Sequence, residues 1–225
     1  MTSDIHHPDL WLTRIRLNPE ATEARRDLAS APALHQTLMR LFPDALGERP
    51  RQTAGVLFRL EEQADTYAVL IQSAMEPELD NLPVHYGSAL AKPLTPLLKQ
   101  LQEGMTVRYR ITANATRRLA INSDRGRVGQ RLPLHGPEAE AWWQRQATTA
   151  GLALHETLST RLPDAAGTRT ADHRRITHAR TRFDGTATIS DPEQTIQHIH
   201  DGIGRGKSYG CGLLSLAPCD KTEDA

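Results

Sequence analysis

Alternating apolar and polar positions predict that the first half of the chain begins with a strand, a helix and two strands. Residues 11–17 alternate between apolar and polar side chains, as in a strand with one buried face. Leucines recur at helical spacing within 30–42, and 55–63 and 67–73 read as two strands joined by a short polar connection. This β-α-β-β order is the beginning of a ferredoxin-like unit. Residues 74–104, which contain four prolines, are expected to hold the remainder of that unit and a linker.

The same order of elements recurs in the second half. A strand, a helix, two strands, a short further stretch, a helix and a last strand are expected over 106–113, 137–150, 152–162, 175–183, 186–190, 192–200 and 213–217. The predicted fold class is therefore α+β, with two ferredoxin-like (RRM-like) βαββαβ domains in tandem.

Domain boundaries follow from these patterns. We expect an N-terminal ferredoxin-like domain over 1–90, a linker over 91–105, a C-terminal ferredoxin-like domain over 106–218 and a tail over 219–225. At 225 residues, the chain is long enough for each domain to bury a core of its own.

Charge is distributed unevenly along the chain, although the formal net charge is zero. Between Met105 and Phe183 there are fourteen arginines and six acidic residues, so the second half is basic and the rest of the chain is acidic. The planar guanidinium of arginine suits phosphates and guanine edges. This distribution indicates an anionic partner for the C-terminal domain, such as a nucleic acid.

Composition also indicates the cellular compartment to expect and whether to expect a cofactor. No apolar run approaches a membrane span, and Met1–Pro8 lacks the apolar core of a signal peptide, so a soluble, cytoplasmic protein without a membrane partner is expected. Cys211 and Cys219 are too few for a disulfide framework, and no cysteine or histidine spacing matches a zinc finger. The pair His198 and His200 has no companion ligands. We therefore predict no metal and no cofactor.

A glycine-rich loop over 202–212 is the most unusual stretch of the sequence. Its five glycines allow positive φ and close approach to a partner, and Arg205 and Lys207 place two cations beside them. It differs from a phosphate-binding P-loop, because Asp201 stands at the first glycine position and a strand is expected to follow. Two interpretations fit the pattern better than a P-loop: a turn that only packs a helix against a strand, or a loop that holds a nucleic-acid backbone.

His35 is a candidate catalytic histidine near the start of the helix over 30–42. Ser30 is a suitable N-cap, and the partial positive charge at a helix N-terminus disfavours imidazolium. A neutral histidine near pH 7 is what a general base requires. The alternative is an ordinary surface or half-buried histidine at the edge of the leucine stripe.

Four phrases of the sequence together carry a family resemblance. They are the opening strand with its Asn18-Pro19 end, the helix phrase from Leu34-His35 to Pro43, the strand end Ala113-Asn114 and the stretch 202–218. These phrases resemble the CasE family, the CRISPR repeat-processing endoribonucleases of the type I-E (Cascade) system. The resemblance extends over residues 10–218 and is most specific at the C-terminal phrase.

The resemblance implies a tandem ferredoxin-like protein that binds the stem-loop of a CRISPR repeat and cuts at the 3′ base of the stem. Cleavage in this family needs no metal. The 2′-hydroxyl attacks the adjacent phosphate and leaves a 2′,3′-cyclic phosphate and a 5′-hydroxyl. The product stays bound and joins the interference complex, so the implied partners are the repeat RNA and the other Cascade subunits.

The resemblance also implies roles for particular residues. His35 corresponds to the family's catalytic histidine, and Lys207 and Ser208 lie nearest the expected scissile phosphate. Some members have a tyrosine three residues before the histidine that assists the reaction, whereas this chain has Pro32 there. Lys207 is the expected source of charge stabilisation in its place, with Tyr209, Arg25 and Arg26 as weaker candidates.

The expected RNA-binding residues are those of the glycine-rich loop and arginines of both domains. They are Gly202, Gly204, Arg205, Gly206, Gly210, Gly212, Arg25, Arg26, Arg117, Arg118, Arg125, Arg127, Arg131, Arg169, Arg174 and Arg175. The arginines of 169–182 lie on an expected hairpin that could enter the major groove at the end of the stem, and those of 117–131 would follow phosphates.

Two other functions stay open at this stage. A non-catalytic scaffold subunit of Cascade that binds repeat RNA is consistent with Pro32 in place of the tyrosine, and it would bind without cutting. A nucleotide-dependent enzyme that uses the glycine-rich loop as a P-loop would bind ATP or GTP with magnesium.

Overall fold

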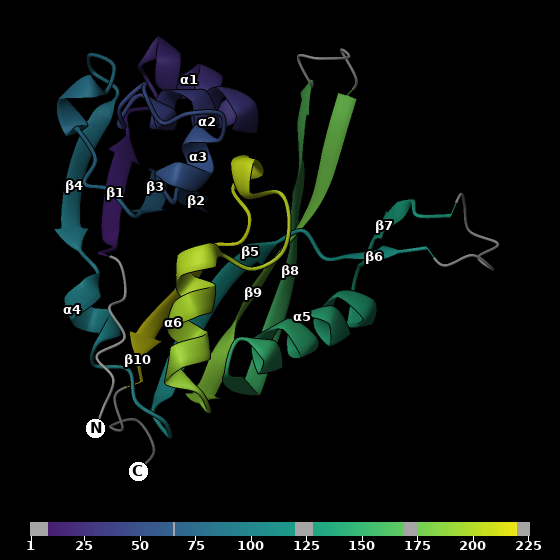
Figure 1. The fold of residues 1–225 in the computed structure, drawn as a ribbon. Coiled ribbons are helices and arrows are strands. Elements are labelled where there is room, and N and C mark those ends of the chain that lie inside the picture. The colour runs from purple at the N-terminus through teal and green to yellow at the C-terminus, as the bar shows by residue number, and fades with distance from the viewer. Residues whose placement is uncertain (1–8, 65, 120–127, 169–174, 220–225) are drawn as a thin grey trace. The chain divides into compact units, whose positions relative to one another are not determined.

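The computed structural model describes residues 9–64, 66–119, 128–168 and 175–219 (Figure 1). The chain divides into two compact units, Met1–Leu101 and Gln102–Ala225, and each has its own four-stranded sheet. The division falls within the stretch 91–105 expected as a linker. That stretch also contains the end of strand β4 (Gly87–Pro93) and the short helix α4 (Thr95–Leu98).

The first unit is a ferredoxin-like sheet in the order β2-β3-β1-β4, and all its neighbouring strands are antiparallel. Its other strands are β1 (Trp11–Leu17), β2 (Leu57–Gln63) and β3 (Thr66–Ser73). Its other helical segments are α1 (Thr22–Ala29), α2 (Ala31–Met39), α3 (Pro50–Thr53) and the 3-10 turn η1 (Leu79–Asn81).

The core of the first unit forms where α1 and α2 pack on the sheet. Ile15 of β1, Leu34 and Leu38 of α2, and Phe58 and Ile71 of the neighbouring strands are each at most 2 % exposed. Every second residue of β1 from position 13 to position 17 is buried, so the alternation predicted for this strand is confirmed.

The sequence pattern does not predict α1 or β4. Helix α1 buries only Ala24 and Asp27, so it carries no apolar stripe. Strand β4 is an edge strand that pairs with β1, and its largest apolar residue, Leu90, is 60 % exposed. Within residues 74–86, the turn η1 stands where a βαββαβ unit has its second helix.

The second unit repeats the ferredoxin-like order as β10-β5-β9-β8. Its strands are β5 (Thr106–Ala113), β8 (Leu152–Thr168), β9 (Arg175–Ile189) and β10 (Leu214–Pro218), with an added small hairpin of β6 (Thr116–Arg118) and β7 (Arg131–Pro133). Helices α5 (Pro137–Thr149) and α6 (Pro192–Asp201) cover one face of the sheet, and the 3-10 turn η2 (Lys207–Tyr209) follows α6 (Figure 1). The predicted tandem ferredoxin-like fold is confirmed.

Aromatic side chains hold α5 on the second sheet. Trp143 of α5 is fully buried, and its ring stacks on Phe183 of β9 with centroids 5.7 Å apart. Tyr109 of β5 also contacts Trp143, with its ring centroid 5.5 Å from that of Trp143. Such aromatic contacts add to the free energy gained by burying the rings.

The hairpin of β8 and β9 extends beyond the rest of the second sheet (Figure 1). Pairing between β5 and β9 ends at Ala113 and Thr181, whereas β8 and β9 stay paired as far as Thr168 and Arg175. We call this two-stranded extension, residues 162–168 and 175–180, the arm. The hairpin predicted for this region is confirmed, and it is longer than expected.

Strand β9 is continuous through residues 184 and 185, whereas separate stretches were expected over 175–183 and 186–190. A Cβ atom at Gly185 would lie 2.0 Å from the carbonyl oxygen of Glu156 and 2.7 Å from the hydroxyl of Tyr109. The Tyr109 hydroxyl donates to that carbonyl oxygen at 2.9 Å. Glycine is therefore required by the close passage of a side chain and a backbone, and it does not end the strand.

This steric requirement predicts that Gly185→Ala destabilises the second unit. Forcing a methyl group into that space should lower the free energy of unfolding by about 2–3 kcal/mol or more, which denaturant unfolding measures. Gly104→Ala is the matched control, because Gly104 has φ of 81° but a Cβ atom there would have no other atom within 4 Å. Alanine in this left-handed conformation should cost about 1 kcal/mol. Equal losses in the two variants would contradict the steric explanation.

Candidate active site

The glycine-rich loop joins α6 to β10, as predicted from the sequence. All five of its glycines have positive φ, between 73° and 95°. At Gly212 the conformation is sterically required, because a Cβ atom would lie 2.9 Å from the carbonyl oxygen of Ile203. The Gly212 amide donates to the carbonyl oxygen of Thr112 on β5 at 2.8 Å, which ties the loop to the sheet. A helix precedes the loop and a strand follows it, which is the reverse of a P-loop.

The cationic residues of the loop differ in their surroundings. Lys207 begins η2, and its ammonium donates to the carbonyl oxygen of Asp201 at 2.5 Å. The charge therefore lies at the C-terminal end of α6, where a cation is favoured. Arg205 is exposed, and Ser208 within η2 is half-buried.

Cys211 lies at the inner side of the loop. It is fully buried, and a Cβ atom on Gly206 would contact its side chain at 3.5 Å. Burial raises the pKa of the Cys211 thiol to about 12. The side chain is therefore a protonated, apolar part of the loop's packing at neutral pH.

His35 lies in the second turn of α2, in the first unit. Ser30 caps that helix by accepting a hydrogen bond from the Ala33 amide at 3.3 Å, so the predicted N-cap is confirmed. The imidazole is half-buried beside Phe58, with ring centroids 6.1 Å apart. Its Nε2 atom is buried and has no hydrogen-bond partner within the described part of the chain.

The electrostatics of His35 favour the neutral ring. Burial, and to a smaller extent the positive charge of Arg51, lower the pKa of His35 to about 4. Arg51 itself donates a hydrogen bond to the carbonyl oxygen of Val56 at 3.0 Å. The helix N-terminus is the cause that the sequence predicts for a neutral histidine, whereas burial is the main cause. Arg51 is sixteen positions away in sequence, and no spacing signal connects it to His35.

The two arginines expected to bind RNA in the first unit have different environments. Arg25 is exposed on α1. Arg26 donates through Nε and Nη2 to the buried carboxylate of Asp27, and Nη2 also donates to Thr37 of α2 at 3.0 Å. Tyr86 donates to the same carboxylate at 2.8 Å. Arg26 therefore ties α1 to α2 while its side chain stays about half exposed.

Three of the arginines expected to bind RNA in the second unit lie on the small β6–β7 hairpin. Arg117, Arg118 and Arg131 are exposed there, and Arg118 pairs in register with Arg131. The expected residues Arg125, Arg127, Arg169 and Arg174 lie outside the described part of the chain, as does the side chain of Arg175 at the start of β9.

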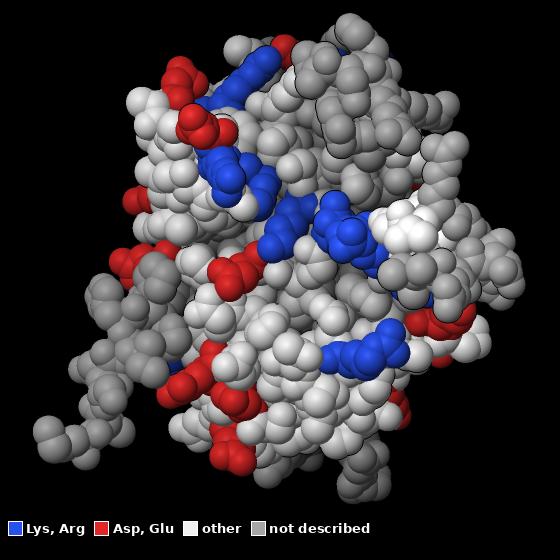
Figure 2. Space-filling view, turned by 45° about the vertical axis from the view of Figure 1, so that its right-hand side comes forward, with Lys and Arg blue, Asp and Glu red and all other residues white. Residues whose placement is uncertain are grey.

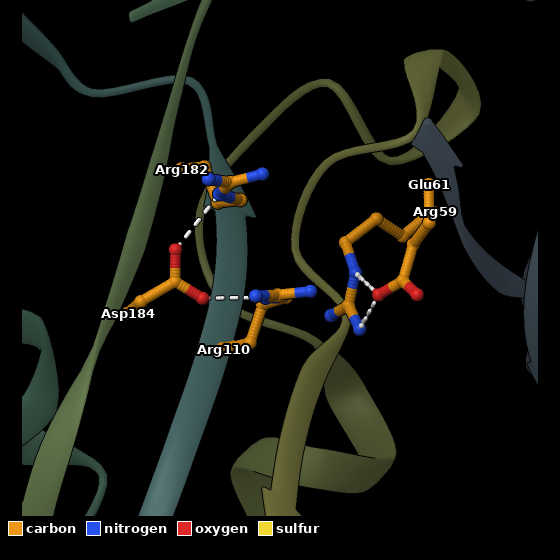
Figure 3. A network of polar contacts seen from close by, with 5 residues as sticks. All are labelled: Arg59, Glu61, Arg110, Arg182 and Asp184. Atoms are coloured by element: carbon orange, nitrogen blue, oxygen red, sulfur yellow. Dashed lines mark hydrogen bonds and ion pairs between the residues drawn. The ribbon is translucent and has the colours of Figure 1, made fainter. Parts of the chain in front are cut away.

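Other arginines of the sheets are engaged by carboxylates. Arg110 and Arg182 each donate through Nε to a different oxygen of Asp184, the latter at 2.7 Å (Figure 3). In the first unit, Arg59 is 3 % exposed and binds Glu61 at 2.8 Å. Figure 2 shows acidic side chains beside several of the basic ones. Several arginines are therefore already paired with carboxylates of the protein, so fewer are available to bind an external anion than the sequence contains.

Comparison with known proteins assigns the chain to a family. A family model described as CRISPR associated protein matches residues 10–218. The chain belongs to this family. The match extends over nearly all of both units.

Two curated members of the CRISPR-associated family are similar to nearly the whole chain. The CRISPR-associated endoribonuclease Cse3 of Thermus thermophilus is 31 % identical over 223 residues, which are 93 % of this chain and 100 % of that protein. The CRISPR system Cascade subunit CasE of Escherichia coli is 34 % identical over 196 residues, which are 82 % of this chain and 90 % of that protein.

Solved structures of this family have the same fold. Thermus thermophilus Cse3 bound to an RNA representing a pre-cleavage complex matches with a TM-score of 0.77 and 32 % identity, and the match covers 93 % of this chain and all of that one. Cas6e of Escherichia coli matches with a TM-score of 0.67 and 26 % identity over 93 % of this chain and all of that one.

The described residues hold neither a membrane-crossing helix nor a metal-binding cluster. No helix among them is long and apolar enough to span a bilayer. They also contain no group of three or more histidine, cysteine or acidic side chains that could hold a metal ion.

The environment of His35 predicts its titration. In the folded protein its pKa should lie near 4, as measured by the chemical shifts of its ring atoms in NMR spectra across pH. Because the unfolded chain titrates near 6.5, the unfolded state binds more protons between these values. The folded state should therefore lose stability as the pH falls from about 6.5 towards 4, and less so in His35→Ala. A measured pKa above 6 would contradict the burial argument.

Proposed function

We propose that this chain is a metal-independent endoribonuclease that processes CRISPR repeat RNA. It binds the stem-loop of the precursor RNA, cuts at the 3′ base of the stem and keeps the product as a subunit of Cascade. Nearly full-length similarity to an endoribonuclease and to a Cascade subunit supports this function. The observation that carries the chemistry is the neutral His35, whose buried Nε2 has no partner among the described residues.

The proposed reaction uses the RNA as its own nucleophile. His35 takes the proton of the 2′-hydroxyl through its free nitrogen lone pair, and the 2′-oxygen attacks the adjacent phosphorus. The bond from phosphorus to the 5′-oxygen breaks, and that oxygen takes a proton from water, to which His35 then releases the proton that it accepted. The products are a 2′,3′-cyclic phosphate and a 5′-hydroxyl. Every atom of the step comes from the RNA and from acid-base groups, so the chemistry itself requires no metal ion.

In this proposal, the glycine-rich loop binds the scissile phosphate. Lys207 stabilises the negative charge that develops on the non-bridging oxygens, with Ser208 beside it, and backbone amides of the loop bind the flanking RNA backbone. The side chain is suited to this role because its ammonium is already oriented by the Asp201 carbonyl oxygen. His35 and Lys207 belong to different units, and the proposal requires both to reach one phosphate.

The exposed arginines are assigned to the RNA stem. Arg25 on α1 and Arg118 and Arg131 on the β6–β7 hairpin have exposed side chains that phosphates can reach. Arg117 on the same hairpin is also exposed, and its Nη1 lies 3.5 Å from a carboxylate oxygen of Glu138. Arg26 acts chiefly through its contacts with Asp27 and Thr37. These arginines contribute affinity that weakens with salt.

Removing His35 should separate cutting from binding. His35→Ala is expected to slow single-turnover cleavage of repeat RNA in EDTA by about 10²–10⁴-fold, while the Kd for an RNA with a 2′-deoxy nucleotide at the cut site stays within about threefold. His155→Ala, on the exposed part of β8, is the matched control and should cut like the wild type.

The outcomes distinguish the two candidate functions. If the wild-type protein binds repeat RNA but cuts it neither in EDTA nor with an added metal ion, the chain is the non-catalytic scaffold instead. If cleavage needs an added metal ion, the proposed use of the 2′-hydroxyl is wrong.

Removing the charge of Lys207 should lower the rate of RNA cleavage more than the affinity for RNA. Lys207→Met is expected to reduce the single-turnover rate by about 10²-fold, as for loss of one group that stabilises developing charge, and Lys207→Arg should recover part of it. Lys99→Met, at an exposed lysine of the first unit, is the control. Cleavage by Lys207→Met at the wild-type rate would remove Lys207 from the mechanism.

A further inference from the structure

The glycine-rich loop packs on the second unit at the place where the arm begins. Strand β5 ends at Ala113, and Asn114 follows it as a buried residue. A Cβ atom on Gly206 would contact the Cβ of Asn114 at 3.6 Å. The loop and the arm therefore meet at Asn114, which belongs to neither of them.

Asn114 continues the sheet with its side chain. Its Nδ2 donates to the carbonyl oxygen of Ala179 on β9 at 2.7 Å. The last pair of the β5–β9 ladder is Ala113 with Thr181, so Asn114 lies one position beyond that pair on its strand and Ala179 two positions beyond it on β9. Its Oδ1 faces Nδ1 of His178 at 3.5 Å. A buried amide with these contacts fixes the base of the arm where backbone pairing has ended.

His178 connects the arm to the turn η2. Its ring lies on that of Tyr209, with centroids 4.4 Å apart and planes tilted by 52°. Tyr209 is the last residue of η2, and its amide donates to the carbonyl oxygen of Gly206 at 2.8 Å. Lys207 is the first residue of the same three-residue turn, so the backbone that carries the Tyr209 ring also carries Lys207.

The charge state of His178 suits this contact. Burial, and then the positive charge of Arg205, lower the pKa of His178 below its ordinary value. At pH 7 the ring is therefore uncharged and packs against Tyr209 as an aromatic surface. The exposed His155 of β8, which contacts Thr188 at 2.7 Å, has no place in this cluster.

We propose that His178 is a positioning residue: its contact with Tyr209 fixes the position of the η2 turn relative to the arm. An RNA stem bound by the arm would then also hold the glycine-rich loop at the scissile phosphate. His178 touches neither the reacting atoms nor the RNA in this role and acts through Tyr209. The inference rests on the proposed function for its effect on cleavage. The contact between arm and loop can be tested without RNA.

A double-mutant cycle measures the coupling. His178→Ala and Tyr209→Ala should each slow single-turnover cleavage by about 3- to 10-fold, and the double variant should be no slower than the slower single variant. The Kd for the 2′-deoxy repeat RNA should change less than the rate. His178→Phe, which retains a ring against Tyr209, should recover most of the rate, and His155→Ala should match the wild type. Effects that multiply in the double variant would overturn the proposal.

Amide hydrogen exchange without RNA tests the same contact independently of catalysis. The amides of Tyr209 and Cys211 donate to Gly206, and His178→Ala should lower their protection by about 3- to 10-fold. Amides of β8 should be unaffected, which shows that the unit remains folded. Unchanged protection of the loop would overturn the proposal even if the protein cuts RNA. A wild-type protein that does not cut, but loses loop protection in His178→Ala, would overturn the proposed function alone.

Discussion

The position of β5 at the centre of its sheet is the constraint on which the second unit depends. It pairs with β9 on one side and with β10 on the other. Strand β9 continues into the arm, and the glycine-rich loop enters β10, so both features begin from neighbours of one strand. Because β5 stops at Ala113 while β9 continues, a buried corner is left at Asn114 in which arm and loop can touch. The buried ring of Trp143 holds α5 against this same sheet.

Much of the fold could be predicted because burial leaves a periodic trace in the sequence. Strand β5 has the predicted bounds, and α5 and α6 differ from the prediction by one residue at the C-terminal end. Elements without a buried stripe leave no such periodic pattern, which is why the sequence did not predict α1 and β4. Around Gly185 the pattern instead suggested two separate stretches where the strand is continuous. Glycine is needed there because the Tyr109 side chain, from another strand, passes close to the backbone.

The candidate site could be predicted in part. His35 and the glycine-rich loop stand out because a capped histidine and five clustered glycines are unusual local patterns. The neutral state of His35 was expected, but its main cause is burial, with a contribution from Arg51, and both depend on tertiary packing. The contact between His178 and Tyr209 joins residues thirty-one positions apart in different elements. Likewise, the arginine count suggested a broad basic surface, whereas Asp27 and Asp184 engage Arg26, Arg110 and Arg182.

The buried thiol of Cys211 has a consequence for how the protein tolerates its chemical surroundings. Oxidants and alkylating reagents attack the thiolate, and a thiol whose pKa is near 12 is almost entirely protonated at neutral pH. The cysteine also lies beneath the loop, where reagents have no direct access. The loop can thus use the packing volume of sulfur without gaining a redox-sensitive group, and its conformation should be the same in reducing and in mildly oxidising solution.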